Sequence, residues 1–277
     1  MKIQRLSAFS DGNQGGNPAG VVISNNLPDS ETMQRVAAEV GFSETAFAAP
    51  VKNRWKVRYF SPETEVPFCG HATIALGAAL ALENGDQVFS LELSKVNITV
   101  EGKKEGAIIS AALQSPPTKS FPVSEELKAE ALSLFGYTEA DLDSRIPIAH
   151  ANAGADFLVI ALSSREKLKA MTYELEAGKA FMHRNGFITV CIVYAENDQM
   201  FHTRNPFASG GVYEDPATGA ATAALCGYLR DISWPHGGEI SIVQGEDMGM
   251  RSLIGAEIGD EPGSSIRVSG SARVMKD

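Results

Sequence analysis

Pro67-Phe68-Cys69-Gly70-His71-Ala72-Thr73-Ile74-Ala75-Leu76 is the stretch that decides the fold, because a second version of it occurs later in the chain. Gly219-Ala220-Ala221-Thr222-Ala223-Ala224-Leu225 repeats its last seven positions with Gly, Ala, Thr, Ala and Leu in register, 149 residues further along. The segments before the two copies, residues 57–62 and 202–208, both read as a strand with arginine and aromatic residues that leads into a turn. An internal duplication is the most economical interpretation.

Each copy predicts a helix without a polar face. Residues 72–82 and 220–229 carry no charged side chain, and a helix that is apolar all round must be enclosed by protein. Neither segment has the roughly 18–20 apolar residues that a membrane span needs. We therefore expect two central helices, over residues 70–84 and 217–231, each wrapped by its own sheet.

The glycine at the start of each helix suggests a function. The first N–H groups of a helix lack partners within it, and with the helix dipole they form an anion-binding site. Two such helix starts, one from each duplicated half, would converge on a cleft between two domains. The alternative is two core helices with ordinary starts.

Composition limits the possible classes of protein. The 277 residues are 44% hydrophobic and 21% charged, which suits two globular domains. A net charge of −10 argues against nucleic-acid binding, since phosphate contacts require an excess of Lys and Arg. Three cysteines make a disulfide framework improbable and favour a reducing compartment. Because the N-terminus also lacks the apolar core of a signal peptide, we expect a cytoplasmic protein.

The order of strands favours an α+β fold. Short strands joined by hairpins precede and follow each predicted central helix, which is unlike the alternation of a doubly wound sheet. The best candidate for a domain boundary is Ser115-Pro116-Pro117-Thr118, because two consecutive prolines interrupt both helices and strand ladders.

The candidate chemistry lies near the two helix starts. No pair among the five histidines has the spacing of a zinc helix, so no metal site is expected. Asp215 precedes the second helix as a site residue or as an ordinary cap. His71 lies at the first helix start, next to Cys69, which is either a reactive or a buried inert thiol. Glu44 is either a sheltered proton acceptor or an exposed strand residue. Asn17, after a glycine-rich loop, lines a site or ends a hairpin turn.

Five spaced motifs resemble one family, the phenazine-biosynthesis F-like (PhzF-like) isomerases. They are residues 16–22, 43–47, 60–66, 69–73 and 214–219. The resemblance implies a diaminopimelate-epimerase-like fold: two pseudo-symmetric domains, each a curved mixed or antiparallel sheet around a central apolar helix. By this resemblance the N-terminal domain covers residues 1–114 together with a C-terminal strand at about 266–277, and the second domain covers 119–265.

The same resemblance implies a function. It predicts a homodimeric, cofactor-independent isomerase that acts on a small carboxylate-bearing metabolite in the interdomain cleft, similar to trans-2,3-dihydro-3-hydroxyanthranilate isomerase. Glu44 would remove and return a carbon-bound proton, while His71 and Asp215 would hold polar groups of the substrate and assist the proton relay. Gly70 and Gly219 would donate backbone N–H groups to a carboxylate.

One position departs from the family pattern: Ala220 stands where the family commonly has Ser, which removes a hydroxyl contact with the substrate. Two alternatives remain open. An amino-acid epimerase would use Cys69, although this chain has no second thiol at the other helix start. A metabolite-binding or protein-interaction module would keep the fold without turnover.

Overall fold

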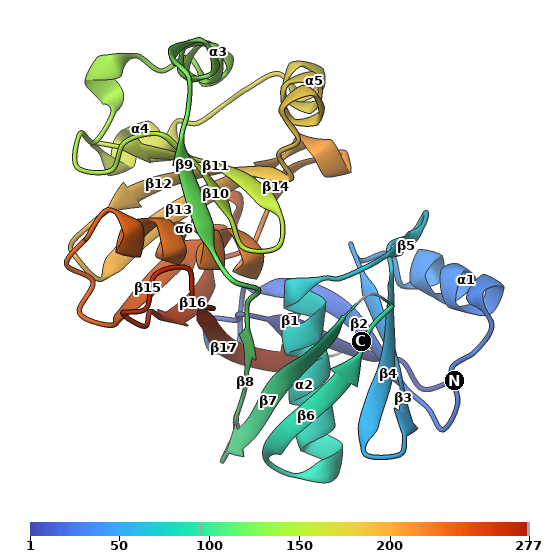
Figure 1. The fold of residues 1–277 in the computed structure, drawn as a ribbon. Helices are drawn as coiled ribbons and strands as arrows, with labels where there is room; N and C mark the ends of the chain where they lie inside the picture. Colours follow the sequence, from blue (N-terminus) through green and yellow to red (C-terminus); the bar gives the residue numbers. More distant parts are fainter. Residues whose placement is uncertain (95, 276–277) are drawn as a thin grey trace. The chain divides into compact units, whose positions relative to one another are not determined.

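The computed structural model describes residues 1–94 and 96–275, and the chain forms two compact units (Figure 1). Unit 1 consists of Met1–Gln114 with Ser269–Asp277, and unit 2 of Ser115–Val268. Each unit has its own central helix, as the duplicated sequence predicts. The two units are described separately below.

Unit 1 is a closed ring of strands around one helix. Its elements are β1 (Gln4–Ala8), β2 (Asn17–Ile23), α1 (Ser30–Val40), β3 (Thr45–Val51), β4 (Arg54–Phe60), β5 (Glu65–Val66), α2 (Gly70–Asn84), β6 (Gln87–Glu92), β7 (Asn97–Glu105), β8 (Ile108–Gln114) and most of β17 (Arg267–Val274). The strands pair in the order β1-β2-β3-β4-β6-β7-β8-β17, and β17 pairs with β1 to close the ring. Closure removes free edges from this sheet.

Helix α2 fills the ring. Every residue from His71 to Ala81 is buried, and Figure 1 shows the helix between the strands of unit 1. It packs closely against β7, because a Cβ added at Gly102 would lie 2.3 Å from the carbonyl oxygen of Gly77. The helix runs over the predicted residues, Gly70–Asn84. The absence of a polar face is thus explained by enclosure.

Helix α1 covers the outside of the same ring. Asp29 caps its start by accepting a hydrogen bond from the Thr32 amide, and Gly41 ends it with φ at 72°, a left-handed conformation that glycine adopts without strain. Met33, Val36 and Ala37 of the helix are buried against side chains of β2, β3 and β4. Unit 1 therefore has an inner core around α2 and an outer core under α1.

Unit 2 is built from eight strands and four α-helices, with three short 3₁₀ turns. Its elements are β9 (Lys119–Pro122), α3 (Glu125–Phe135), η1 (Glu139–Asp141), β10 (Ala149–Asn152), β11 (Asp156–Leu162), α4 (Arg165–Lys169), α5 (Leu175–Asn185), β12 (Thr189–Ala195), β13 (Met200–Phe207), η2 (Ala208–Gly210), β14 (Val212–Asp215), α6 (Gly219–Asp231), β15 (Glu239–Gln244), η3 (Glu246–Met248) and β16 (Ser252–Glu257). Residues of α3, α4 and α5 share one apolar cluster with strands β11 and β12.

The central helix of unit 2 differs slightly from the prediction. Helix α6 begins at Gly219, two residues later than the expected start at 217, and its N-cap residue is Thr218. Asp215 ends β14 and does not cap the helix. Its carboxylate accepts a hydrogen bond from the Thr218 hydroxyl instead.

The strand pairings of the two units follow the same order. In unit 1, β1–β2 is antiparallel, β2–β3 parallel, β3–β4 antiparallel, β4–β5 antiparallel, β4–β6 parallel and β6–β7 antiparallel. The pairs β10–β11, β11–β12, β12–β13, β13–β14, β13–β15 and β15–β16 of unit 2 have the same directions in the same order. An identical sequence of parallel and antiparallel pairs confirms the internal duplication.

An ion pair also repeats. Arg58 of β4 binds Glu65 of β5 at 2.6 Å, and Arg204 of β13 binds Glu214 of β14 at 2.5 Å. The registers agree, because the residue two places after each arginine lies opposite the glutamate. The two pairs therefore fix which residues of the two units are equivalent.

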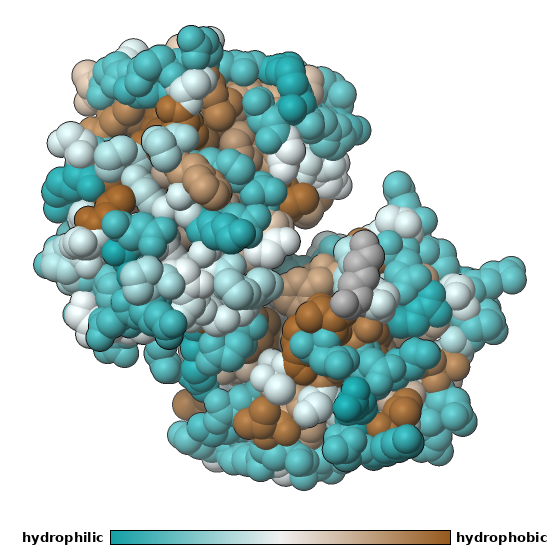
Figure 2. All heavy atoms as spheres, in the orientation of Figure 1, coloured by the Kyte–Doolittle hydropathy of each residue, from teal (hydrophilic) through white to brown (hydrophobic). Residues whose placement is uncertain are grey.

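One face of the protein can be followed by its hydropathy. The face in Figure 2 is mostly hydrophilic, with apolar side chains in separate small groups. Among the described residues, no helix has the length and apolarity to span a membrane.

Candidate active site

The first group of candidate residues comes from two segments of unit 1. Glu44 immediately precedes β3, and its backbone oxygen accepts a hydrogen bond of 3.1 Å from the Gly20 amide of β2. Cys69 is the N-cap residue of α2, and His71 is the second residue of that helix. Strand pairing and helix burial thus bring together residues that lie 25 or more positions apart in the sequence.

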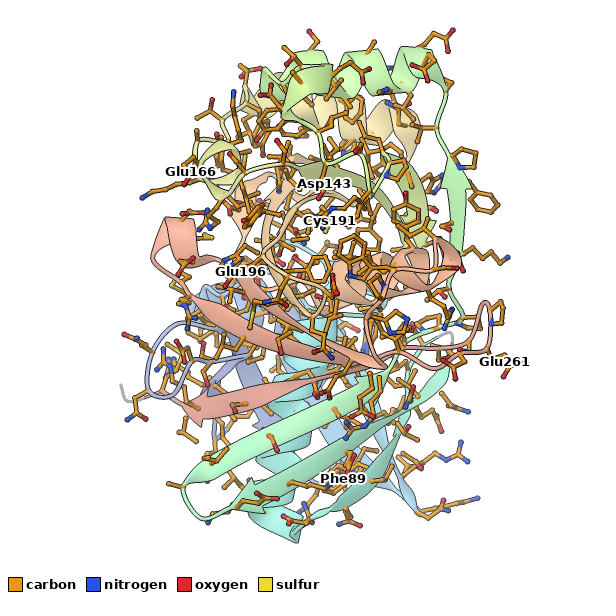
Figure 3. All side chains as sticks on the ribbon, turned by 90° about the vertical axis from the view of Figure 1, so that its left-hand side faces the viewer. Phe89, Asp143, Glu166, Cys191, Glu196 and Glu261 are labelled. Carbon is orange, nitrogen blue, oxygen red and sulfur yellow. The ribbon has the colours of Figure 1, made fainter. Side chains whose placement is uncertain are left out.

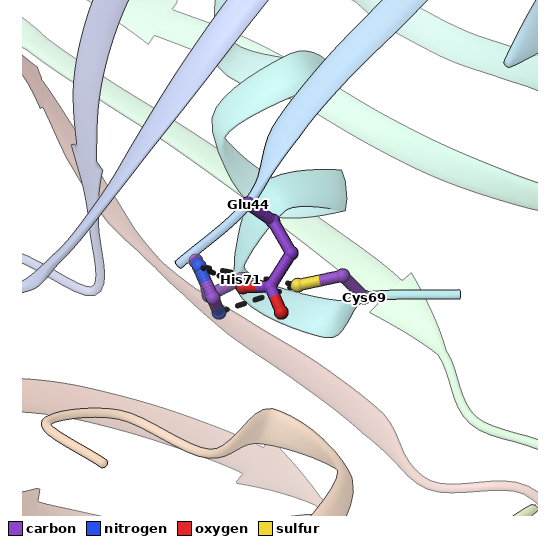
Figure 4. A group of neighbouring side chains, drawn as sticks. All are labelled: Glu44, Cys69 and His71. Carbon is purple, nitrogen blue, oxygen red and sulfur yellow. Dashed lines mark hydrogen bonds and ion pairs between the residues drawn. The ribbon is translucent and has the colours of Figure 1, made fainter. Parts of the chain in front are cut away.

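The side chains of Glu44, Cys69 and His71 converge (Figure 4). His71 Nε2 lies 3.4 Å from Glu44 Oε2, and His71 Nδ1 lies 3.4 Å from Cys69 Sγ. The Ser43 hydroxyl oxygen is 3.3 Å from the same Nε2. Only 15% of the Glu44 side chain and 7% of the His71 side chain are exposed. A sheltered carboxylate in contact with an imidazole can accept and return a proton.

Ser43 belongs to this group, and the sequence did not predict it. Its position next to Glu44, within a motif that carried the family resemblance, was the available signal. Asn17, by contrast, is the first residue of β2, lies opposite Ala8 and is 2% exposed.

The same three side chains could hold a metal ion. One ligand atom each from Glu44, Cys69 and His71 lies within 4.8 Å of the others, and among the described residues they form the one such group. A carboxylate oxygen, a thiol sulfur and an imidazole nitrogen are the ligand types that zinc prefers. No metal site was expected from the sequence, because the carboxylate comes from a segment 25 residues before Cys69.

The second group lies in unit 2, at the start of α6. The Thr218 hydroxyl lies 2.5 Å from Asp215 Oδ2. Gln244, the last residue of β15, hydrogen-bonds both the backbone and the hydroxyl of Thr218. Gly219 is buried and Ala220 half-buried at the first two positions of the helix. The sequence predicted Asp215, Gly219 and Ala220, but not Gln244.

The other two thiols are poor candidates for chemistry. Cys191, on β12 within unit 2 (Figure 3), is fully buried, and burial raises its pKa to about 12. Burial also raises the pKa of Cys226. Thiols of this kind stay protonated near neutrality. Cys69 is the remaining candidate.

Equivalent positions of the two units carry different side chains. The repeated ion pairs and strand registers set these correspondences. Glu44 corresponds to Thr189, Val66 to Asp215, Cys69 to Thr218, His71 to Ala220 and Leu93 to Gln244.

Comparison with known proteins places the chain in a family. Residues 6–277 match the model of the phenazine biosynthesis-like proteins. The chain belongs to this family. It is 30% identical over 285 residues to an uncharacterized isomerase of Bacillus subtilis, covering 97% of this chain and 94% of that protein. It is 30% identical over 281 residues to trans-2,3-dihydro-3-hydroxyanthranilate isomerase of Pseudomonas aeruginosa, covering 98% and 96%.

Solved structures of other proteins have the same fold. A PhzF-family protein from Bacillus anthracis superimposes with a TM-score of 0.86 at 21% identity, covering 100% of this chain and 98% of the other. A hydroxyproline epimerase from Agrobacterium vitis superimposes with a TM-score of 0.66 at 11% identity, covering 99% and 90%. The fold is thus the diaminopimelate-epimerase-like α+β fold that the sequence predicted, and the protein is an isomerase.

Proposed function

We propose that the protein is a cofactor-independent isomerase that moves a proton between carbon atoms of a small carboxylate-bearing metabolite. The observation that carries this proposal is the contact of 3.4 Å between the Glu44 carboxylate and His71 Nε2 in a sheltered position at the start of α2. The carboxylate supplies the base.

The reaction is a transfer within one substrate. Glu44 takes a proton from a substrate carbon, and the electron pair of that bond delocalises toward the substrate carboxylate. Glu44 then returns the proton to a different carbon, so the enzyme ends in its starting state. A positioned acid/base of this kind contributes about 10²–10⁴-fold to the rate.

The helix starts supply the remaining roles. Backbone N–H groups at Gly70 and Gly219 would donate to the substrate carboxylate, and such donors stabilise developing charge by about 2.7–4 kcal/mol each. His71 and Asp215 would hold polar groups of the substrate and assist the relay. Ala220 and Asn17 would line the space beside the substrate, where the side chain of Ala220 donates no hydrogen bond.

We further propose that the protein works in the cytoplasm as a homodimer on a small molecule. The family resemblance supports the dimer, and the net charge of −10 supports the absence of a nucleic-acid partner.

An NMR experiment tests the proposal. The protein is incubated in D₂O with small unsaturated, hydroxy and amino carboxylates, including trans-2,3-dihydro-3-hydroxyanthranilate, and loss of each C–H signal is followed. We expect protein-dependent exchange or isomerisation of at least one compound. Binding without exchange or isomerisation across the whole panel would instead favour a metabolite-binding module.

An amino-acid epimerase is the second candidate, favoured by the distance of 3.4 Å between Cys69 Sγ and His71 Nδ1. Thr218 stands at the equivalent position of unit 2, where a two-thiol epimerase would need its second cysteine. Cys69→Ala decides between the candidates. Retained exchange supports Glu44 as the base, whereas complete loss of exchange together with inversion of an amino-acid centre by the unmodified protein supports the thiol.

A further inference from the structure

Gln244 makes a set of hydrogen bonds that the strand pairing of unit 2 does not require. It is 1% exposed. Its Oε1 accepts from the Thr218 amide at 3.0 Å, and its Nε2 donates to the Asp215 backbone oxygen at 2.7 Å and to Thr218 Oγ1 at 3.0 Å. One side chain thus binds both ends of the turn that leads from β14 into α6.

These contacts fix the direction of the next hydrogen bond. In an amide side chain only the carbonyl oxygen can accept a hydrogen bond from an N–H. Because Gln244 Oε1 accepts from the Thr218 amide, the amino group at the other side of the side chain faces Thr218 Oγ1. Because Thr218 Oγ1 accepts this hydrogen, its own hydroxyl hydrogen is available for Asp215 Oδ2, 2.5 Å away. The Thr218 hydroxyl therefore donates to the Asp215 carboxylate.

Unit 1 shows that the fold does not need this network. Lys56 of β4 lies opposite Glu92, and the equivalent His202 of β13 lies opposite Val243. The next residue is Leu93 in unit 1 and Gln244 in unit 2. Leu93 is 7% exposed, so an apolar side chain is accommodated at this position of the fold.

The two partners of Gln244 also lack counterparts in unit 1. Val66 occupies the position of Asp215, and Cys69 that of Thr218. Buried polar groups cost free energy unless they are hydrogen-bonded. Because unit 1 folds with Val66, Cys69 and Leu93 at these positions, the connected polar side chains of unit 2 point to a role other than folding.

We propose that Gln244 is a positioning residue, which sets the Thr218 hydroxyl to donate to Asp215 and so holds the Asp215 carboxylate in one orientation toward the substrate. This inference rests on the proposed function, in which Asp215 binds a polar group of the substrate. Gln244 touches no reacting atom itself. It acts through Thr218.

Two substitutions separate positioning from structural support. Gln244→Leu installs the residue type that unit 1 has at this position and removes all three hydrogen bonds. Gln244→Glu keeps an acceptor for the Thr218 amide. Because burial raises the pKa of a carboxyl group at this position, the variant is assayed at a pH high enough to ionise it, where the carboxylate competes with Asp215 for the Thr218 hydroxyl hydrogen. Hydrogen exchange of the Thr218 amide reports the structural bond in each variant: we expect faster exchange with Gln244→Leu and unchanged exchange with Gln244→Glu.

We expect the activity of each variant to depend on the hydrogen bond of the Thr218 hydroxyl and not on that of the Thr218 amide. We expect kcat/KM to fall about 10–10²-fold in both variants, the size of effect caused by small misplacement of a reacting group. Gln199→Glu makes the same chemical change at an exposed glutamine of unit 2 and should leave activity unchanged. Wild-type activity in Gln244→Glu would overturn the proposal.

A double variant gives the decisive control. In an Asp215→Asn background, Gln244→Glu should cause little further loss, because its effect passes through Asp215. Losses that multiply in the double variant would overturn the role of Gln244 while leaving the proposed function standing. A wild-type protein that neither exchanges a proton of any compound of the panel nor isomerises one would instead overturn the proposed function itself.

Discussion

Unit 1 and unit 2 have the same strand pairings but different chemistry at the starts of their central helices. The start of α2 has Glu44, Cys69 and His71, whereas the equivalent residues at α6 are Thr189, Thr218 and Ala220. The start of α6 has its own polar set, Asp215, Thr218 and Gln244. Burial of the central helix constrains the apolar positions of each unit, whereas the residues at the two helix starts differ in chemistry.

The largest effect on activity is expected at Glu44, where unit 1 has a carboxylate and unit 2 has a threonine. Glu44→Gln removes the proposed base and should reduce substrate proton exchange about 10²–10⁴-fold. Thr189→Val changes the equivalent residue of unit 2, a side chain that is 1% exposed, and should leave exchange at the wild-type rate. The measurement is the loss of the substrate C–H signal in D₂O. An unchanged exchange rate in Glu44→Gln would show that Glu44 is not the base.

The repeated ion pairs differ in burial, so removing each one should lower the free energy of unfolding by a different amount. The side chains of Arg204 and Glu214 are 10% and 3% exposed, whereas those of Arg58 and Glu65 are 24% and 37% exposed. Glu214→Ala removes the carboxylate partner of a buried guanidinium, which still donates to the backbone oxygens of Lys169 and Met171. Breaking a buried ion pair costs about 3–5 kcal/mol. Glu65→Ala should cost at most about 1 kcal/mol, since solvent screens an exposed pair.

Each unit has one tryptophan, which allows the two costs to be measured separately. Trp55 lies on β4 of unit 1 and Trp234 follows α6 in unit 2. Glu214→Ala is therefore examined by urea unfolding with Trp55→Phe in the background, and Glu65→Ala with Trp234→Phe. Equal losses of unfolding free energy would contradict the difference in burial.

A third effect tests how closely α2 fits its ring. An alanine at Gly102 would place Cβ against the backbone oxygen of Gly77, which cannot rotate away. Gly102→Ala should lower the unfolding free energy of unit 1 by about 1–3 kcal/mol, the usual cost of overpacking. Gly259→Ala is the control, because its nearest neighbour is a serine hydroxyl at 3.9 Å. No loss at Gly102 would mean that the strand moves away from the helix.

The smallest effect is the pH dependence of the exposed ion pair. Hydrogen bonds from Arg58 hold the pKa of Glu65 below its ordinary value of 4.5. Because the pKa is lower in the folded state, the pair stabilises unit 1 above pH 4.5, and this stability is lost as pH falls through the folded pKa. The difference in unfolding free energy between wild type and Glu65→Gln should shrink below pH 4.5. A difference that stays constant to pH 2 would refute this coupling.

The sequence predicted the parts of the fold that depend on apolar patterning. The bounds of α2 were predicted as they occur, because an uncharged helix led by glycine has few alternative starts. The start of α6 was placed two residues early, because Asp215-Pro216 has the pattern of a helix cap. In the structure Gln244, 26 or more residues away, binds this segment, and a contact at that range leaves no local signal.

The candidate site was predictable in part for a different reason. Glu44 and His71 were candidates from their own positions, but their roles were predicted from the family motifs, since no local pattern shows that a strand residue approaches a helix start. Ser43 was missed although it lies within a motif, and Gln244 was missed because a lone glutamine at a strand end is a common feature. Contacts between distant segments become visible only with the pairing of β2 with β3 and of β13 with β15.

Strand β17 has a consequence for synthesis on the ribosome. Without it, β1 and β8 each lack a partner on one side, and unpaired edges recruit other chains. Residues 1–114 are made long before residue 274, and at about 5–20 residues per second the interval lasts roughly 10–30 s. During that time the nascent chain carries two open edges beside an apolar helix, so its yield in a cell should depend on chaperones that shield them.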